Sequence, residues 1–133
     1  MMDPRLSLML DEPQRTFRPG ELLAGQFFLE GVRPEEIRAV EVSVLWHTEG
    51  KGDEDMAVHF FERIDPDLDD VVDLRQPRRL STVLPNSPLS YHGQIVKIRW
   101  CVRVRAFFWH GKELAAEVPF QLGAVPRPQE APV

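Results

Sequence analysis

Seven basic side chains carry the clearest chemical signal in the sequence, because no acid interrupts the segment that contains them. Residues 74–112 include eight Lys or Arg residues and no Asp or Glu, whereas residues 53–73 include nine acids and one base. Cations at alternate positions of a strand repel one another, which favours pairing with the acidic segment, an anionic partner, or exposure to solvent. The candidate partner-binding residues are Lys97, Arg99, Arg103, Arg105, Arg75, Arg78 and Arg79.

The single cysteine, Cys101, is the candidate nucleophile. It lies between Arg99 and Arg103 on one side of an alternating segment, and nearby cations lower the pKa of a thiol and increase its reactivity. The alternative is a small side chain that fills space on a sheet face. No serine lies in a Gly-x-Ser-x-Gly turn, so we expect no catalytic residue.

Two histidines form the candidate metal site. His47 and His59 flank a polar loop, could be diagonal neighbours on one sheet face, and with Asp53 or Asp55 would supply enough ligands for zinc. No His-x-His or paired-cysteine spacing accompanies them. Residues 65–76 begin like a calcium loop, but the loop glycine and the bidentate glutamate are missing. We therefore expect no metal and no other cofactor.

These side chains must be positioned by strands. Apolar and polar residues alternate over residues 94–108, which predicts one long strand with a buried face and an exposed face. Trp46 and Trp100 are expected in or near the core, and the basic stripe on the exposed face. The same pattern and the turn signals between segments predict seven strands, at residues 6–10, 22–30, 37–48, 56–63, 80–84, 95–108 and 114–122, and a short helical turn after Pro34.

Length and composition predict one soluble domain. The chain has 133 residues, enough for one core. We expect a single domain over residues 1–123 and a flexible, proline-rich tail over residues 124–133. A net charge of −5 argues against a nucleic-acid partner. With one cysteine, no signal peptide and no apolar run near the roughly 20 residues that span a bilayer, the chain is expected to be cytoplasmic, without an integral membrane segment.

Many short strands separated by turns predict an all-β sandwich. Three groups of motifs then resemble one half of an arrestin. They are Phe-Arg-Pro-Gly-Glu at 17–21 followed by Gly-Gln-Phe-Phe-Leu at 25–29; Ile-Arg-Ala-Val-Glu-Val at 37–42; and Leu84-Pro85, Ser90-Tyr91-x-Gly93 and Ile98-Arg99-Trp100-x-Val102. The order and spacing agree over residues 5–123. The bacterial sporulation-control proteins and the retromer cargo-adaptor subunit are similar in the same way.

The resemblance implies an immunoglobulin-like antiparallel β-sandwich of the arrestin type and a non-catalytic role. Those proteins are adaptors or regulators built from two such halves, whereas this chain resembles one half, so functions of the cleft between halves are not carried over. We expect a protein–protein interaction module that binds another protein through sheet edges and through an acidic segment docked on the basic face. The alternatives are a structural homo-oligomer, such as a homodimer, assembled through edge strands, and a less favoured metal- or thiol-dependent enzyme.

Overall fold

The computed structural model describes residues 3–12, 15–52, 54–66 and 73–123. These residues form one short 3-10 helix, η1 (Pro34–Glu36), and the following strands. The strands are β1 (Arg5–Leu10), β2 (Thr16–Phe17), β3 (Leu22–Glu30), β4 (Ile37–Gly50), β5 (Met56–Ile64), β6 (Arg78–Val83), β7 (Tyr91–His92), β8 (Val96–Phe108) and β9 (Glu113–Leu122).

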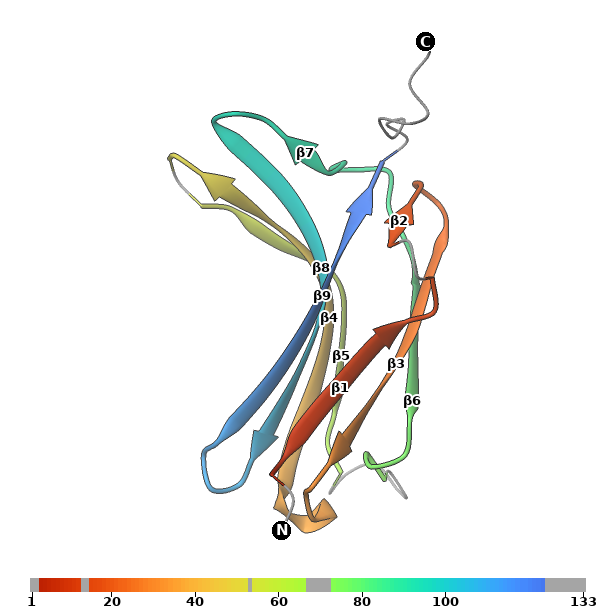
Figure 1. Cartoon of the computed structure of the whole chain (residues 1–133), viewed down its shortest axis with the longest axis vertical. Helices are drawn as coiled ribbons and strands as arrows, with labels where there is room; N and C mark the ends of the chain where they lie inside the picture. Colours follow the sequence, from red (N-terminus) through yellow and green to blue (C-terminus); the bar gives the residue numbers. More distant parts are fainter. Residues whose placement is uncertain (1–2, 13–14, 53, 67–72, 124–133) are drawn as a thin grey trace.

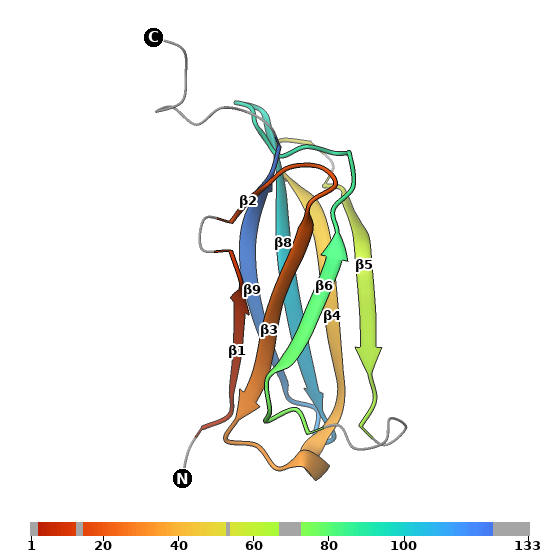
Figure 2. The same ribbon diagram turned by 90° about the vertical axis from the view of Figure 1, so that its right-hand side faces the viewer.

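The strands form two sheets that face each other (Figure 1 and Figure 2). One sheet has the order β1–β3–β6, and the other has the order β2–β9–β8–β4–β5, with β7 also paired to β8. Neighbouring strands are antiparallel except β2 and β9, which are parallel. The expected all-β sandwich is therefore confirmed. No helix in the described part of the chain is long and apolar enough to cross a lipid bilayer.

The core lies between the sheets, where the alternating residues of β4 and β8 meet those of β3. On β8, Trp100 is 1% exposed, and Val102, Val104 and Phe108 are also buried, as the alternation predicts. Trp46 packs against the same core. Cys101 departs from the expectation, since it belongs to the outer face but only 3% of its surface is exposed.

All seven predicted strands are present, with bounds that differ from the predictions by at most two residues. The short helical turn after Pro34 is also present, and the side chain of Glu36 accepts a hydrogen bond from the Arg33 N–H at 3.0 Å. Sequence reasoning missed β2 and β7 because each has two residues, which is too short for any period to be visible. The predicted tail at 124–133 lies outside the described residues.

The six-stranded sheet branches near one end of the sandwich. β9 pairs with β8 as far as Trp100 and Phe120, and then continues beside β2. β7 takes the vacated place next to β8. Figure 1 shows the result, with β8 and the β4–β5 hairpin bending away from β9 and β2 at the top of the molecule.

Candidate protein-binding surface

The outer face of the six-stranded sheet carries the predicted basic stripe, but each of its arginines is paired. In every pair the arginine Nε of β8 donates to a glutamate oxygen of β4 or β9. The pairs, which we call the ion-pair ladder, are Arg99–Glu49 at 2.7 Å, Arg103–Glu117 at 2.6 Å and Arg105–Glu113 at 2.7 Å. The counter-ions of these three arginines therefore come from the neighbouring strands β4 and β9.

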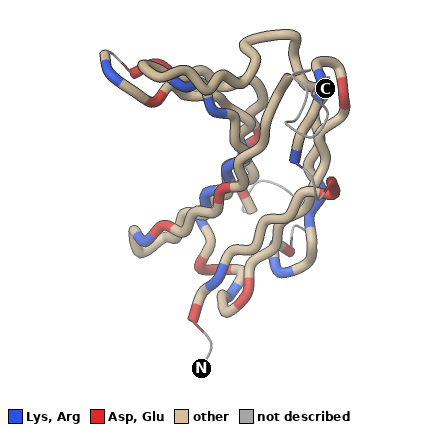
Figure 3. The backbone as a smooth tube through the Cα atoms, turned by 45° about the horizontal axis from the view of Figure 1, so that its top comes forward, with Lys and Arg blue, Asp and Glu red and all other residues tan. Residues whose placement is uncertain are grey.

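Of the other candidate cations, Lys97 lies beside the ladder on β8, and the remaining three lie away from it. Arg75 pairs with Asp73 at 3.0 Å, and Arg79 pairs with Asp11. Within the described residues, Lys97 and Arg78 have no ion pair, and the buried Nε of Arg78 has no hydrogen-bond partner. Figure 3 shows acids and bases interleaved over the backbone. The structure thus divides the seven cations between β8 and the segment that leads into and forms β6.

Three of these carboxylates are held more firmly in the charged form by their ion pairs. The hydrogen bond from Arg105 lowers the pKa of Glu113, and the hydrogen bond from Arg79 lowers the pKa of Asp11. His47 and then Arg99 lower the pKa of Glu49. All of these groups lie in contact with solvent, where ion pairs are weak and are screened by salt. A charged side chain of a partner could therefore replace one member of a ladder pair at little cost in free energy.

An apolar row on β5 lies on the same outer face. Met56, Val58 and Phe61 are 56%, 48% and 53% exposed. In the register with β4 they lie opposite His47, Leu45 and Ser43, which alternate along one face of that strand. Leu45 itself is 2% exposed. The row therefore borders a small buried apolar patch, made by Leu45 and Cys101, beneath the ladder.

A β-bulge aims this row outward. The register shifts between Val44 and Leu45, so that Val44 pairs with Phe60 while Leu45 pairs with Val58. His59 is the extra residue. As a result Phe60 packs against the core and Phe61 is exposed. A regular alternation over residues 56–63 would place Phe61 on the opposite face to Val58, which is why sequence reasoning did not find the row.

Burial, and not the neighbouring cations, controls the Cys101 thiol. The pKa of Cys101 is raised to about 11, first by burial and then by Glu117, while Arg103 acts in the opposite direction. In the register Cys101 lies between Leu45 and Pro119. At neutral pH the thiol is protonated, so this position suits a space-filling side chain better than a nucleophile.

The two candidate metal ligands do not converge. His47 Nε2 lies 3.2 Å from Glu49 on the outer face. His59 Nε2 lies 2.8 Å from the Val83 carbonyl oxygen of β6, and its ring meets that of Trp100 edge to face. The arrangement considered for them, as diagonal neighbours on one sheet face, is not found, because the bulge redirects His59 toward the other sheet. Asp53 and residues 67–72 of the calcium-like segment lie outside the described residues.

The comparisons with known proteins show the fold. No family model and no curated protein matches the sequence. Among solved structures, the chain is similar to Spo0M, a sporulation control protein from Bacillus subtilis, with a TM-score of 0.63 and 14% sequence identity. The match covers 95% of this chain and 51% of that one, so this chain spans about half the length of Spo0M. The resemblance seen in the sequence is thus confirmed at the level of fold, which is an arrestin-like β-sandwich of the kind found in a sporulation control protein.

Proposed function

We propose that the chain is a non-catalytic protein-interaction module of the adaptor or regulatory kind, and that an extended segment of a partner protein binds beside β5. One observation carries the proposal: β5 is an edge strand of its sheet and presents Met56, Val58 and Phe61 about half exposed on one face. An edge strand offers unpaired backbone N–H and C=O groups to an added strand. The side chains of the row would then fix which segment binds.

The surroundings of the row suit an interface. Productive interfaces place an aromatic or aliphatic group at the centre and polar groups at the rim. Phe61 would be the central group, and the ion-pair ladder two strands away would be the rim. An acidic part of the partner would contact this rim by exchanging with Glu113 or Glu117. Of the seven candidate cations, Lys97 and Arg78 have no ion pair within the described residues that such a segment would need to displace.

The fold gives looser support. Spo0M is described as a sporulation control protein, which is a regulatory role, and one fold can carry many functions. The enzyme alternative was raised by Cys101, His47 and His59. The burial of the thiol and the separation of the two histidines favour a binding module over that alternative. The β5 surface carries the proposal, and the likeness to Spo0M sets only its broad class.

A site-specific cross-linking experiment tests the proposal. A photoreactive phenylalanine analogue at position 61 should cross-link one protein partner in cells, and the same analogue at position 22 should not. Leu22 is the matched control because it is 59% exposed on β3 of the other sheet. The cross-linked protein is then purified, and its affinity for the free chain is measured directly.

Paired variants complete the test. Val58→Glu with Phe61→Glu should weaken the partner's affinity by more than about ten-fold, as expected when central interface groups are lost. Leu22→Glu should change the affinity by less than about two-fold. Equal losses for both variants, or cross-links from position 22 alone, would show that β5 is not the binding strand. A cross-link to a second copy of the chain, together with dimer mass in solution, would favour the homo-oligomer instead.

A further inference from the structure

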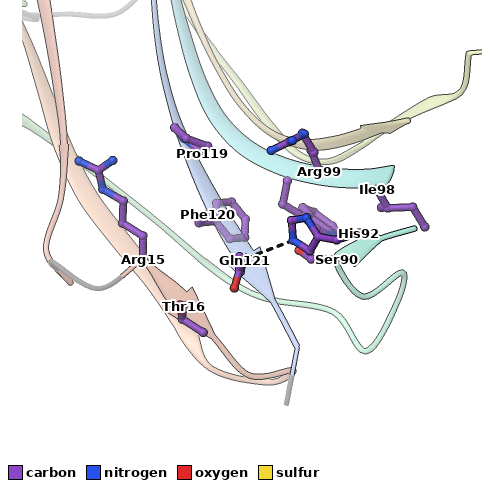
Figure 4. A pocket seen from close by; sticks show the side chains of 10 residues that line it. Arg15, Thr16, Ser90, His92, Ile98, Arg99, Pro119, Phe120 and Gln121 are labelled. Atoms are coloured by element: carbon purple, nitrogen blue, oxygen red, sulfur yellow. Dashed lines mark hydrogen bonds between the residues drawn. The ribbon is translucent and has the colours of Figure 1, made fainter. Parts of the chain in front are cut away.

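A pocket of about 280 Å³ lies at the branch point of the six-stranded sheet (Figure 4). β8 and β9 separate after Trp100 and Phe120, and Ser90 bridges the gap next to β7. The Ser90 N–H donates to the Leu122 carbonyl at 2.7 Å, and its hydroxyl accepts from the Leu122 N–H at 2.9 Å. β7 pairs with β8 on one side of the pocket, and β2 pairs with β9 on the other.

The polar lining of this pocket is basic. Arg15, Arg99 and His92 line it, and none of the described residues in its lining is Asp or Glu. In a chain of net charge −5 this is a local reversal of sign. Figure 4 shows Arg15 and Arg99 on opposite sides of β9, with Gln121 and Pro119 between them. Both arginines line the same pocket.

The two arginines have donors to spare. Arg99 uses its Nε for Glu49 at 2.7 Å, which leaves the terminal amino groups of a side chain that has five N–H donors. The side chain of Arg15 has no hydrogen bond or ion pair within the described residues. Gln121 Nε2 lies 3.1 Å from His92 Nε2. If the amide donates in this contact, His92 keeps the proton of its neutral ring on Nδ1 as a further donor.

The backbone at Arg15 is held in an unusual conformation. Its φ of 58° lies in the left-handed region, which is uncommon for a residue with a Cβ atom. The Arg15 carbonyl accepts from the Gln121 N–H at 2.9 Å, so pairing with the end of β9 fixes this conformation. Unfavourable backbone conformations that the surrounding structure enforces are concentrated at ligand sites.

The apolar lining that a ligand can reach is aliphatic. Trp100 and Phe120 lie beneath the pocket with their ring centroids 5.8 Å apart, but they are only 1% and 5% exposed. Ile98 and Pro119 supply the apolar surface of the lining. Guanidinium groups pair with carboxylates and phosphates alike, but an apolar lining favours an anion that carries an apolar group over a fully polar one.

We propose that this pocket binds a carboxylate attached to an apolar group. Arg15, Arg99 and His92 hold the carboxylate, and Ile98 and Pro119 contact the apolar part. Two sources share this chemistry, a free carboxylic acid and the C-terminal residue of a polypeptide. The apolar row of β5 lies at the opposite edge of the six-stranded sheet. Arg99 belongs both to the pocket and to the ion-pair ladder, whereas Arg15 belongs to the pocket alone, so the Arg15 variant tests this proposal independently of the first.

An NMR titration of the full chain tests the proposal. The probes are N-acetyl-phenylalanine, its uncharged C-terminal amide, acetate, inorganic phosphate, and an N-acetylated Ala-Ala-Phe tripeptide. N-acetyl-phenylalanine should bind with a Kd at least about ten-fold lower than the amide, acetate or phosphate, as expected when a charged hydrogen bond or apolar contact is lost. The Trp100 indole N–H and the Gln121 side-chain amide should report the binding by changes in chemical shift.

Variants locate the charge. Arg15→Gln should raise the Kd for N-acetyl-phenylalanine about ten-fold, and Arg99→Gln should act in the same direction. Arg5→Gln is the matched control, since it removes one exposed arginine at the start of β1, at the other end of the molecule (Figure 1), and should change the Kd by less than about two-fold. A melting curve for each variant checks that the fold is retained.

The tripeptide separates the two sources. Binding of the tripeptide at least as tight as that of N-acetyl-phenylalanine assigns the site to a polypeptide C-terminus, and weaker binding assigns it to a free acid; both support the proposal. Equal binding of the amide would overturn it, because the carboxylate would then be irrelevant. Phosphate binding as tight as that of N-acetyl-phenylalanine, or a Kd unchanged by both arginine variants, would overturn it as well.

Discussion

Trp100 and Phe120 are cross-strand neighbours with ring centroids 5.8 Å apart, and they form the last pair before β8 and β9 separate. Phe120 in turn meets Phe17 of β2 edge to face at 5.6 Å. The Trp100 indole N–H donates to the Pro88 carbonyl at 2.7 Å. One aromatic cluster therefore connects the central strands to both short strands that sequence reasoning missed, β2 directly and β7 through the segment that precedes it.

Truncating this cluster should cost much of the domain's stability. Trp100→Ala should lower the free energy of unfolding by on the order of 3–5 kcal/mol, as for other buried large aromatic residues, because it removes a side chain that is 1% exposed and its hydrogen bond. Urea denaturation measures the change. Trp109→Ala is the control, since Trp109 is 58% exposed, and it should cost less than about 1 kcal/mol. Equal midpoints for the two variants would show that the inward orientation of Trp100 is wrong.

A second prediction concerns the close approach of β1 and β3. A Cβ atom added to Gly25 would lie 2.5 Å from the Met9 carbonyl oxygen, so β1 must move away. Gly25→Ala should cost on the order of 1–3 kcal/mol, as for other overpacked sites. Amide hydrogen exchange should show faster exchange in β1, including the Asp11 N–H that donates to the Ala24 carbonyl, with little change in β8. Unchanged exchange throughout β1 would contradict the close packing of these strands.

Most of the fold could be predicted because long strands leave a clear periodicity. β4 and β8 each alternate over more than ten residues, enough to identify their strand bounds and buried faces. The β5 row could not be predicted, because one extra residue, His59, reverses the faces that follow it and no local pattern marks the bulge. The pocket was missed for a different reason. It depends on where β9 leaves β8, which is set by contacts with Ser90 and Thr16 that lie far away in the sequence.

The sequence predicts the arginines of the ion-pair ladder but not their glutamate partners. The stripe on β8 was visible as alternating basic residues, but its partners belong to strands whose register the sequence does not specify. Glu117 lies opposite Arg103. Glu113 lies opposite Phe107, two register positions from Arg105 on the same face. A shift of β9 by one residue would turn both acids to the buried face. The pairing is thus a consequence of the packing of β9 and not of charge alone.

Cys101 should be unreactive in the folded protein at neutral pH. Its pKa is raised to about 11 from an ordinary value of 9.0, so reaction with a disulfide reagent should follow the unfolding equilibrium below pH 9. The raised pKa also predicts a pH dependence of stability. Because the folded state holds the proton more tightly, the stabilising contribution of Cys101 is complete below about pH 9 and is lost between pH 9 and 11.

Comparison with Cys101→Ala isolates this contribution, because the other titrating groups are common to both proteins. The free energy of unfolding of the wild type, relative to the variant, should decline between pH 9 and 11 and be constant below that range. Rapid thiol modification of the folded protein at pH 7 would instead indicate an activated thiolate, and would revive the thiol-dependent enzyme.

The last prediction separates the structural role of the ladder from a role in binding. Arg103→Glu places a second carboxylate opposite Glu117, and like charges opposite each other on a sheet cost up to roughly 1 kcal/mol. The double variant Arg103→Glu with Glu117→Arg restores an ion pair with its polarity reversed, so it should recover most of that stability. Urea denaturation in low and high salt measures both effects, and the difference between the variants should shrink as salt screens the charges.

The double variant then serves as a folded protein in which one cation of the stripe has moved from β8 to β9. If an acidic segment of a partner binds the basic stripe, the partner identified by cross-linking should lose affinity for the double variant, and the loss should be largest at low salt, because charge steering acts mainly on the association rate. Equal affinity for wild type and double variant would assign Arg103 to the internal pairing of the sheet. Binding would then depend on the apolar row of β5 without a contribution from Arg103.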